Sequence, residues 1–134
     1  MKFIEDLKRE VYCRLAPSCI HGVGVVAIRD IPKGINPMRE TRKSVFHSIP
    51  VRAIQQSEHI SDAVKQLAKD MCPQEGDVYL VPNYSLNEIG ISYYLNHSNT
   101  PNMEERDGDF YTLNEIKAGQ ELTVNYSSYG ELNL

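Results

Sequence analysis

Asn96 and His97 are the two side chains whose types and position first suggest chemistry. They lie in the run YYLNHSNTPN, residues 93–102, where Asn, Ser, Thr and Pro occur at a density typical of an ordered turn. Such a turn holds the Asn amide and the His imidazole in fixed directions, so both can form directed hydrogen bonds. These residues alone leave two interpretations open. Either the pair binds a ligand, or His97 caps the turn while Asn96 adopts a left-handed conformation.

Two other parts of the chain have residue types suited to a ligand site. Gly22-Val23-Gly24 carries little side-chain bulk, so its backbone can approach a ligand closely; an ordinary turn before a strand is the alternative. Tyr126 ends the segment LTVNY. A phenol with a reference pKa of about 10 donates a hydrogen bond at neutral pH without becoming charged. The alternative for a lone Tyr at the end of a strand is a half-buried core aromatic.

Many short strands separated by turns are predicted to position these residues. Apolar and alternating segments predict strands over residues 11–15, 25–28, 78–81, 110–113 and 122–126. Asp107-Gly108 predicts a hairpin turn. Helical spacing within residues 1–10 is compatible with a short amphipathic helix or a loose arm, and it predicts a longer helix over 50–71, which ends before Pro73. We therefore expect one domain, residues 1–134, that is mostly β, with several short irregular sheets and one inserted helix.

Composition excludes several classes of function. The chain has 14 Lys and Arg against 18 Asp and Glu, a net charge of -4, which disfavours direct nucleic-acid binding through phosphate attraction. No apolar run approaches the length of a membrane span, so no membrane partner is expected. No export signal opens the chain, and we expect an intracellular protein, cytoplasmic or nuclear. Three cysteines without CxxC spacing predict reduced thiols rather than a zinc site or a disulfide framework.

Three segments together resemble the SET domain of protein-lysine methyltransferases. They are HGVGVVAIRDIPKG (21–34), LNHSNTPN (95–102) and FYTLNEIKAGQELTVNY (110–126), in this order, and the resemblance covers about residues 11–129. It implies a β-clip, SET-like fold with an inserted helical region at about 50–72. It also implies a knot-like threading of the C-terminal segment, rare among folds, which brings Asn96-His97 beside Tyr126.

The resemblance further implies S-adenosylmethionine as cofactor and methyl transfer to a lysine side chain of a protein substrate. Tyr126 matches the family's catalytic tyrosine, and Glu121 matches an acidic position that we expect to be structural. The residues expected to bind the cofactor are Gly22, Val23, Gly24, Asn96, His97 and Tyr126. Those expected to form the walls of the lysine channel are Tyr94, Tyr111, Val124 and Tyr129, with Tyr93 a further candidate.

The chain departs from the family pattern at two positions. Asn99 stands where many members have a Cys, and no Cys-rich tail follows, so we expect no zinc. The same missing tail leaves one wall of the channel to Tyr129, to the terminal SYGELNL segment or to a second subunit, in a monomer or homodimer. Val124 stands where many members carry a Phe or Tyr that limits the number of methyl groups added. Two other functions stay open: a non-catalytic SET module that binds a peptide or partner protein, and methylation of a different nucleophile.

Overall fold

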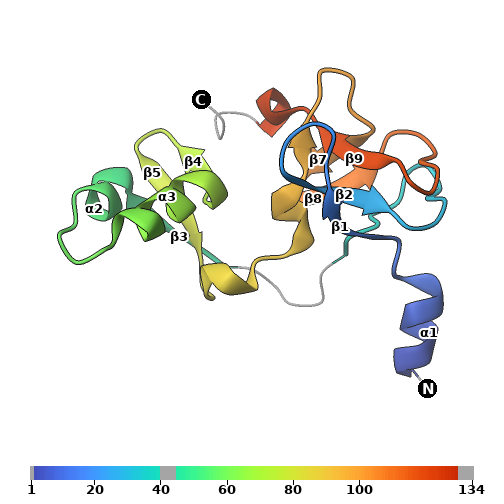
Figure 1. Cartoon of the computed structure of the whole chain (residues 1–134), viewed down its shortest axis with the longest axis horizontal. Helices are drawn as coiled ribbons and strands as arrows, with labels where there is room; N and C mark the ends of the chain where they lie inside the picture. Colours follow the sequence, from blue (N-terminus) through green and yellow to red (C-terminus); the bar gives the residue numbers. More distant parts are fainter. Residues whose placement is uncertain (1, 40–44, 130–134) are drawn as a thin grey trace. The chain divides into compact units, whose positions relative to one another are not determined.

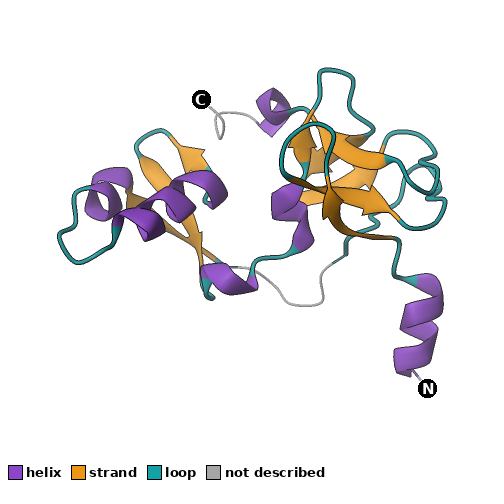
Figure 2. Ribbon diagram, viewed as in Figure 1, coloured by secondary structure: helices purple, strands orange, loops and turns teal. Residues whose placement is uncertain are grey.

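The computed structural model describes residues 2–39 and 45–129 (Figure 1). The chain divides into two compact units. The sheet unit consists of residues 1–41 and 90–128, and the inserted unit consists of residues 42–89 together with 129–134. Short strands dominate the sheet unit, whereas the inserted unit combines a small sheet with helices (Figure 2). The prediction of a mostly β protein with several short sheets is confirmed.

The sheet unit contains a four-stranded sheet in the order β1-β2-β9-β6. Its strands are β1 (Cys13–Pro17), β2 (Val23–Ala27), β6 (Asn96–His97) and β9 (Glu121–Val124). β1 and β2 are antiparallel, as are β2 and β9, whereas β6 runs parallel to β9 and aligns Asn96 with Thr123 and His97 with Val124. The strand nearest the C-terminus thus lies between two strands that come earlier in the chain (Figure 1).

Apolar residues of β2 and β9 form the centre of the sheet unit. Val25, Leu122 and Val124 are completely buried, as are Ile31 and Ile116, which pair as an isolated bridge beside the sheet. Because β9 is covered on both faces, three consecutive residues of ELTV are buried instead of alternating. The apolar segment predicted over residues 122–126 is therefore a central strand, and this fixes where its last residues emerge.

Strands β7 (Met103–Arg106) and β8 (Asp109–Thr112) form a separate antiparallel hairpin. The predicted turn at Asp107-Gly108 is confirmed: both residues have positive φ, 53° and 87°. This backbone matches the right-handed twist of a two-residue hairpin, and Asp-Gly tolerates it better than most pairs. At its base the Thr112 hydroxyl donates to the Pro32 carbonyl at 2.7 Å, which fastens the hairpin to the loop after β2.

Of the two alternatives for residues 1–10, the structure has the helix, α1 (Lys2–Arg9). The Arg29 guanidinium donates to the Lys8 carbonyl at 2.6 Å and lies over the ring of Tyr12, 4.2 Å from its centroid. Two 3₁₀ helices flank the Asn-His turn and the last strand: η2 (Ile91–Tyr94) and η3 (Tyr126–Tyr129). These two helices lie on either side of the region that the sequence predicts to be a functional site.

The inserted unit contains a three-stranded sheet, β3-β5-β4, and two helices. Its elements are β3 (Phe46–Pro50), α2 (Val51–Gln55), α3 (Asp62–Met71), β4 (Gln74–Glu75), β5 (Val78–Pro82) and the 3₁₀ helix η1 (Leu86–Glu88). The single helix predicted over 50–71 is replaced by two, because the Ser61 side chain accepts the Val64 N–H and starts α3 anew. Both helices lie within the predicted helical region of about 50–72, and strands flank them on both sides; the bounds of the single domain stay a prediction.

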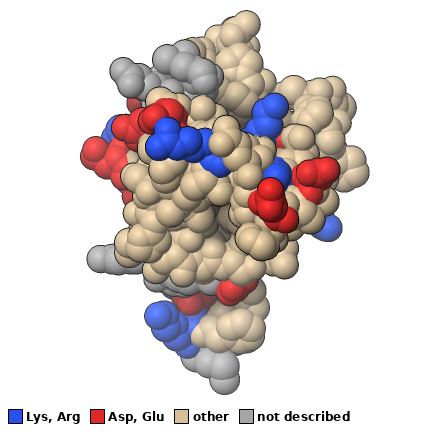
Figure 3. All heavy atoms as spheres, turned by 90° about the vertical axis from the view of Figure 1, so that its left-hand side faces the viewer, with Lys and Arg blue, Asp and Glu red and all other residues tan. Residues whose placement is uncertain are grey.

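Two features of the structure concern the predictions that the protein binds neither nucleic acid nor membrane: the distribution of surface charge and the length of the helices. On the face shown in Figure 3, Lys and Arg side chains lie interspersed with Asp and Glu side chains instead of forming one basic area. Within the described ranges, no helix combines the length and the apolar character needed to cross a bilayer. That the protein binds neither nucleic acid nor membrane stays a prediction.

Candidate active site

Asn96 lies at the centre of the candidate site, on the short strand β6, with 7% of its surface exposed. Its amide nitrogen lies 2.8 Å from the Glu121 carboxylate, on the neighbouring β9. The same nitrogen lies 3.2 Å and 3.3 Å from the carbonyls of His21 and Val23. Asn96 therefore connects the loop before β2 to the last strand, and its buried amide is satisfied by protein atoms.

Ser18 holds the other side of this loop. Its hydroxyl donates to the Glu121 carboxylate at 2.7 Å and accepts the backbone N–H groups of Ile20 and His21 at 2.9 and 3.2 Å. Its own N–H donates to the Gly22 carbonyl at 2.8 Å. We refer to Ser18, Asn96 and Glu121 as the polar network. It fixes the loop of residues 18–24 against β6 and β9 through charge-assisted hydrogen bonds.

Gly24 is where the polar network and the glycine-rich loop meet. A Cβ atom at this position would overlap a carboxylate oxygen of Glu121, and it would lie 2.8 Å from the Glu121 Cδ and 3.0 Å from the Asn96 amide nitrogen. Protein atoms thus occupy the space that a side chain at Gly24 would need. Gly22 differs: it has open space around it but a φ of 49°, a conformation that glycine adopts at little cost. Cofactor binding by the backbone of Gly22, Val23 and Gly24 stays a prediction.

His97 and Tyr126 lie against each other, although 29 positions separate them in the sequence. The backbone N–H of Tyr126 donates to Nδ1 of His97 at 3.1 Å, and the two rings contact each other at a centroid distance of 5.2 Å, tilted by 54°. Nε2 of His97 lies 3.0 Å from the Asn99 side-chain oxygen. Since Nδ1 accepts, the ring proton belongs on Nε2, which donates to Asn99. The His97 imidazole therefore accepts the Tyr126 N–H in its neutral form and thereby orients Tyr126.

The Tyr126 hydroxyl donates to the Leu95 carbonyl at 2.6 Å. Burial raises the pKa of this phenol, and the negative charge of Glu121 raises it further. Both effects favour the neutral form, so Tyr126 holds its proton at neutral pH and is unsuited to act as a base. A phenol oxygen, a backbone carbonyl and a carboxylate thus lie in one region, next to the Asn-His turn.

The residues predicted to form the channel walls lie on four different elements. Tyr94 is half-buried in η2, and Tyr111 lies on β8 beneath the guanidinium of Arg106, which is 4.0 Å from its ring centroid. Val124 is completely buried and offers no exposed surface. Tyr129 ends η3, and its side chain, like the last five residues of the SYGELNL segment, falls outside the described part. These wall positions and the threaded C-terminal segment stay predictions.

Three residues of the site were not singled out by the sequence. Ser18 precedes the glycine pair and has an ordinary turn composition, so only the structure shows that its hydroxyl reaches Glu121. Leu95 contributes a backbone carbonyl, for which a sequence has no signal. Asn102 donates to the Glu121 carbonyl at 2.9 Å and accepts the Thr123 N–H at 2.8 Å. Its amide thereby substitutes for a neighbouring strand along β9.

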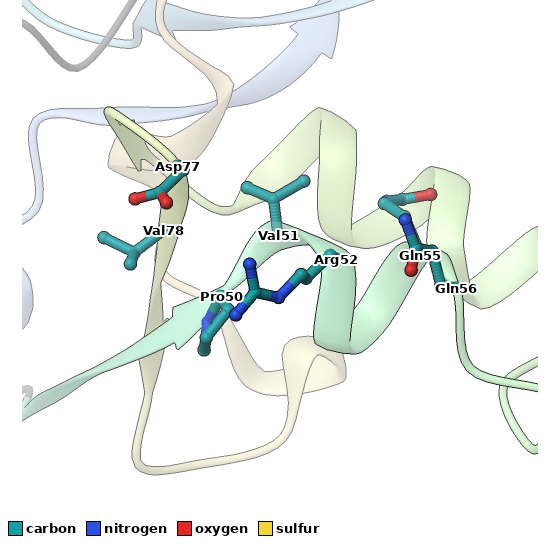
Figure 4. Close-up of a pocket in the computed structure, with 7 residues that line it drawn as sticks. All are labelled: Pro50, Val51, Arg52, Gln55, Gln56, Asp77 and Val78. Carbon is teal, nitrogen blue, oxygen red and sulfur yellow. The ribbon is translucent and has the colours of Figure 1, made fainter.

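Two pockets lie apart from these residues. The first, about 320 Å³ within the inserted unit, lies between the start of α2 and the start of β5; its lining residues are Pro50, Val51, Arg52, Gln55, Gln56, Asp77 and Val78 (Figure 4). The second, about 290 Å³ in the sheet unit, includes Tyr12, Met38 and Ile91. None of the predicted site residues lines either pocket. Across residues 2–39 and 45–129, no group of three His, Cys, Asp or Glu side chains is arranged to hold a metal ion, and the expected lack of zinc stays a prediction.

Comparisons with known proteins place this geometry in a family. The family model of the SET domain matches residues 22–127. A crystal structure of a Plasmodium falciparum protein proposed to be a histone methyltransferase is 21% identical, with 87% of this chain and 93% of that chain covered and a TM-score of 0.49.

A second solved structure is a humanized mutant of the Chaetomium thermophilum Polycomb Repressive Complex 2 bound to the inhibitor GSK126. It is 18% identical, with a TM-score of 0.56, and covers 92% of this chain. This chain corresponds to only 16% of that longer chain, so the likeness concerns the fold. No curated protein sequence matches. Since the family model spans most of the chain and includes the Asn-His turn and Tyr126, this protein belongs to the SET domain family.

Proposed function

We propose that this protein is a methyltransferase that uses S-adenosylmethionine to methylate a lysine side chain of a protein substrate. Membership of the SET domain family supports the class of reaction. The observation that carries the proposal is the contact of Tyr126 with the Asn-His turn: its ring lies on His97 and its hydroxyl binds the Leu95 carbonyl. Asn96 of the same turn is hydrogen-bonded to the glycine-rich loop.

The chemistry of the surrounding groups fits a positively charged cofactor. The Leu95 carbonyl, the Tyr126 hydroxyl and the Glu121 carboxylate are oxygen acceptors, and the polar network contains no Lys or Arg. When bound, S-adenosylmethionine supplies a methyl group on positively charged sulfur; the lysine nitrogen forms the new bond to carbon as the carbon–sulfur bond breaks. Asn96, His97 and the loop of residues 18–24 would hold this cofactor beside Tyr126.

The attacking lysine must first lose its proton to solvent. At pH 7 this costs roughly 4 to 5 kcal/mol for a free Lys with a pKa of about 10.4. A narrow apolar channel reduces the cost because it disfavours the ammonium form. We propose that Tyr94, Tyr111 and Tyr129 contribute to it, whereas Val124 is completely buried and can only support the wall from behind. The protein then needs no strong base, which is consistent with a Tyr126 that keeps its proton.

Tyr126 acts by orientation. Its hydroxyl donates its proton to the Leu95 carbonyl, which fixes the direction of the oxygen lone pairs, and this oxygen would accept weak C–H···O contacts from the reacting carbon. Its backbone N–H is fixed by His97, and its ring is held by the tilted contact with the imidazole. The main catalytic contribution of the chain would be alignment of the reacting atoms.

The test is a pair of measurements on wild type and Tyr126→Phe. We expect wild type to bind S-adenosylmethionine in titration calorimetry and to transfer a labelled methyl group to lysine in a protein extract or in itself. Phe keeps the ring on His97 but loses the hydroxyl, so we expect transfer to fall about 100-fold or more while binding changes little. Tyr12→Phe, which alters a tyrosine under Arg29 at the α1 end, is the matched control and should keep full activity.

Three outcomes separate the competing functions. A wild-type protein that binds no S-adenosylmethionine is a non-catalytic module for a peptide or partner protein. Label on a residue other than lysine shows a different nucleophile. Full activity in Tyr126→Phe refutes the role of its hydroxyl. We further propose intracellular protein substrates, in line with the three unpaired cysteines, and light scattering would show whether the enzyme acts as a monomer or homodimer.

A further inference from the structure

Glu121 is a half-buried carboxylate whose hydrogen-bond partners carry no charge. The Ser18 hydroxyl and the Asn96 amide donate to it at 2.7 and 2.8 Å. The ion pairs formed between described residues involve other acidic side chains, and Glu121 is in none of them. Two neutral donors solvate a carboxylate without cancelling its charge, so a full negative charge remains at this point of the site.

The position of this charge is fixed on three sides. Gly24 leaves room for the carboxylate, and Asn96 and Ser18 hold one oxygen each. The charge also acts on Tyr126, where it adds to burial in keeping the phenol protonated. Glu121 also belongs to the same site by geometry: Asn96, which donates to its carboxylate at 2.8 Å, is followed directly by His97, which accepts the backbone N–H of Tyr126 at 3.1 Å.

S-adenosylmethionine and its product, S-adenosylhomocysteine, differ in charge at one atom. The sulfur is positive before methyl transfer and neutral afterwards. A fixed negative charge in a partly buried site interacts with the first and not with the second. We propose that the Glu121 carboxylate makes the site selective for the positively charged sulfonium over the neutral thioether product. The inference rests on the proposed function and adds a specificity-determining residue to it.

A purely structural role for Glu121 makes a different prediction. If the carboxylate only holds the loop of residues 18–24, its loss weakens the binding of both ligands alike, because both share the parts that this loop contacts. Ser18→Ala provides that case: it removes a hydroxyl from the polar network and leaves the charge of Glu121 in place. The ratio of the dissociation constants for S-adenosylmethionine and S-adenosylhomocysteine therefore distinguishes an effect of the Glu121 charge from an effect on the structure of the loop.

The experiment measures the dissociation constants of both ligands by calorimetry for wild type, Glu121→Gln and Ser18→Ala. Gln has nearly the shape of Glu and keeps an acceptor for Asn96. We expect the preference for S-adenosylmethionine over S-adenosylhomocysteine to fall about fivefold or more in Glu121→Gln, as expected for one charge acting over a partly buried path, and to stay unchanged in Ser18→Ala. Circular dichroism checks that each variant is folded.

A second measurement uses wild type alone, in case Glu121→Gln does not fold. Raising the salt from about 0.05 to 0.5 M should reduce the preference for the sulfonium, since screening weakens charge interactions and leaves the thioether unaffected. If the ratio of the two dissociation constants changes less than twofold in Glu121→Gln, the inference is overturned and the proposed function stands. If that variant is unfolded, a wild-type ratio that does not change with salt has the same meaning. A wild type that binds neither ligand overturns the proposed function, and with it the inference.

Discussion

Replacing Gly24 by Ala tests the packing at the centre of the site. The new Cβ would overlap an oxygen of Glu121, lie 2.8 Å from its Cδ, and lie 3.0 Å from the Asn96 amide nitrogen. Since Glu121 is held on both oxygens, it cannot turn aside without breaking charge-assisted hydrogen bonds. Such bonds contribute about 1.5–3 kcal/mol each, and overpacking costs about 1–3 kcal/mol. We expect Gly24→Ala to lower the free energy of unfolding by about 2–4 kcal/mol.

The assay is urea denaturation followed by circular dichroism, carried out as a double-mutant cycle with Glu121→Ala. If the clash is the cause, removing the Glu121 side chain should recover at least about 1 kcal/mol of the loss in Gly24→Ala. Gly22→Ala is the control, because it has open space and costs about 1–2 kcal/mol only through its positive φ. That cost should add to Glu121→Ala without coupling.

The reasoning is refuted if Gly24→Ala unfolds within about 0.5 kcal/mol of wild type. It is equally refuted if the effects of Gly24→Ala and Glu121→Ala simply add. Either result would mean that the polar network leaves room for a side chain at Gly24. A ligand could then approach the Gly24 backbone closely, as the sequence predicts.

Two further outcomes follow from the surrounding structure. Asn102→Ala should cost about 2–3 kcal/mol in urea denaturation, because it leaves two half-buried backbone groups of β9 without partners, whereas the exposed Asn114→Ala should stay within about 0.5 kcal/mol. Burial raises the pKa of Cys13 from 9.0 to about 11, so its contribution to stability is complete below about pH 9 and is lost as the pH rises through 11. Cys13→Ala should therefore lose less stability than wild type between pH 9 and 11, and the exposed Cys19→Ala should follow wild type; equal slopes for Cys13→Ala and wild type would contradict this.

Local signals in the sequence predicted secondary structure well where neighbouring residues determine the backbone conformation. Asp107-Gly108 dictates a hairpin, since few residue pairs accept two positive φ angles, and the structure has that turn. The helix over residues 50–71 was predicted too long because its apolar spacing continues through a segment where Ser57 and Ser61 hydrogen-bond backbone N–H groups. Side chains that compete for backbone donors interrupt a helix without disturbing its periodicity.

The candidate site was predictable only through resemblance to a family. Nothing in the spacing of Asn96, His97 and Tyr126 indicates that β6 and β9 lie parallel and adjacent, because the pairing of distant strands depends on the whole sheet. The hydrogen-bond partners that complete the site could not be predicted from the sequence for a second reason. Leu95 acts through a backbone atom, and Ser18 reaches a carboxylate 103 residues later in the sequence.

The central place of β9 has a consequence for how the protein is made. β9 follows every other described strand in the order of synthesis, yet it lies between β2 and β6 in the sheet. On the ribosome, the β1–β2 hairpin can form early, while the apolar face of β2 has no strand to cover it and β6 has no neighbour in the sheet. The nascent chain must keep these surfaces from aggregating until Glu121–Val124 emerges. Ordering of the Asn-His turn is thereby tied to the synthesis of β9.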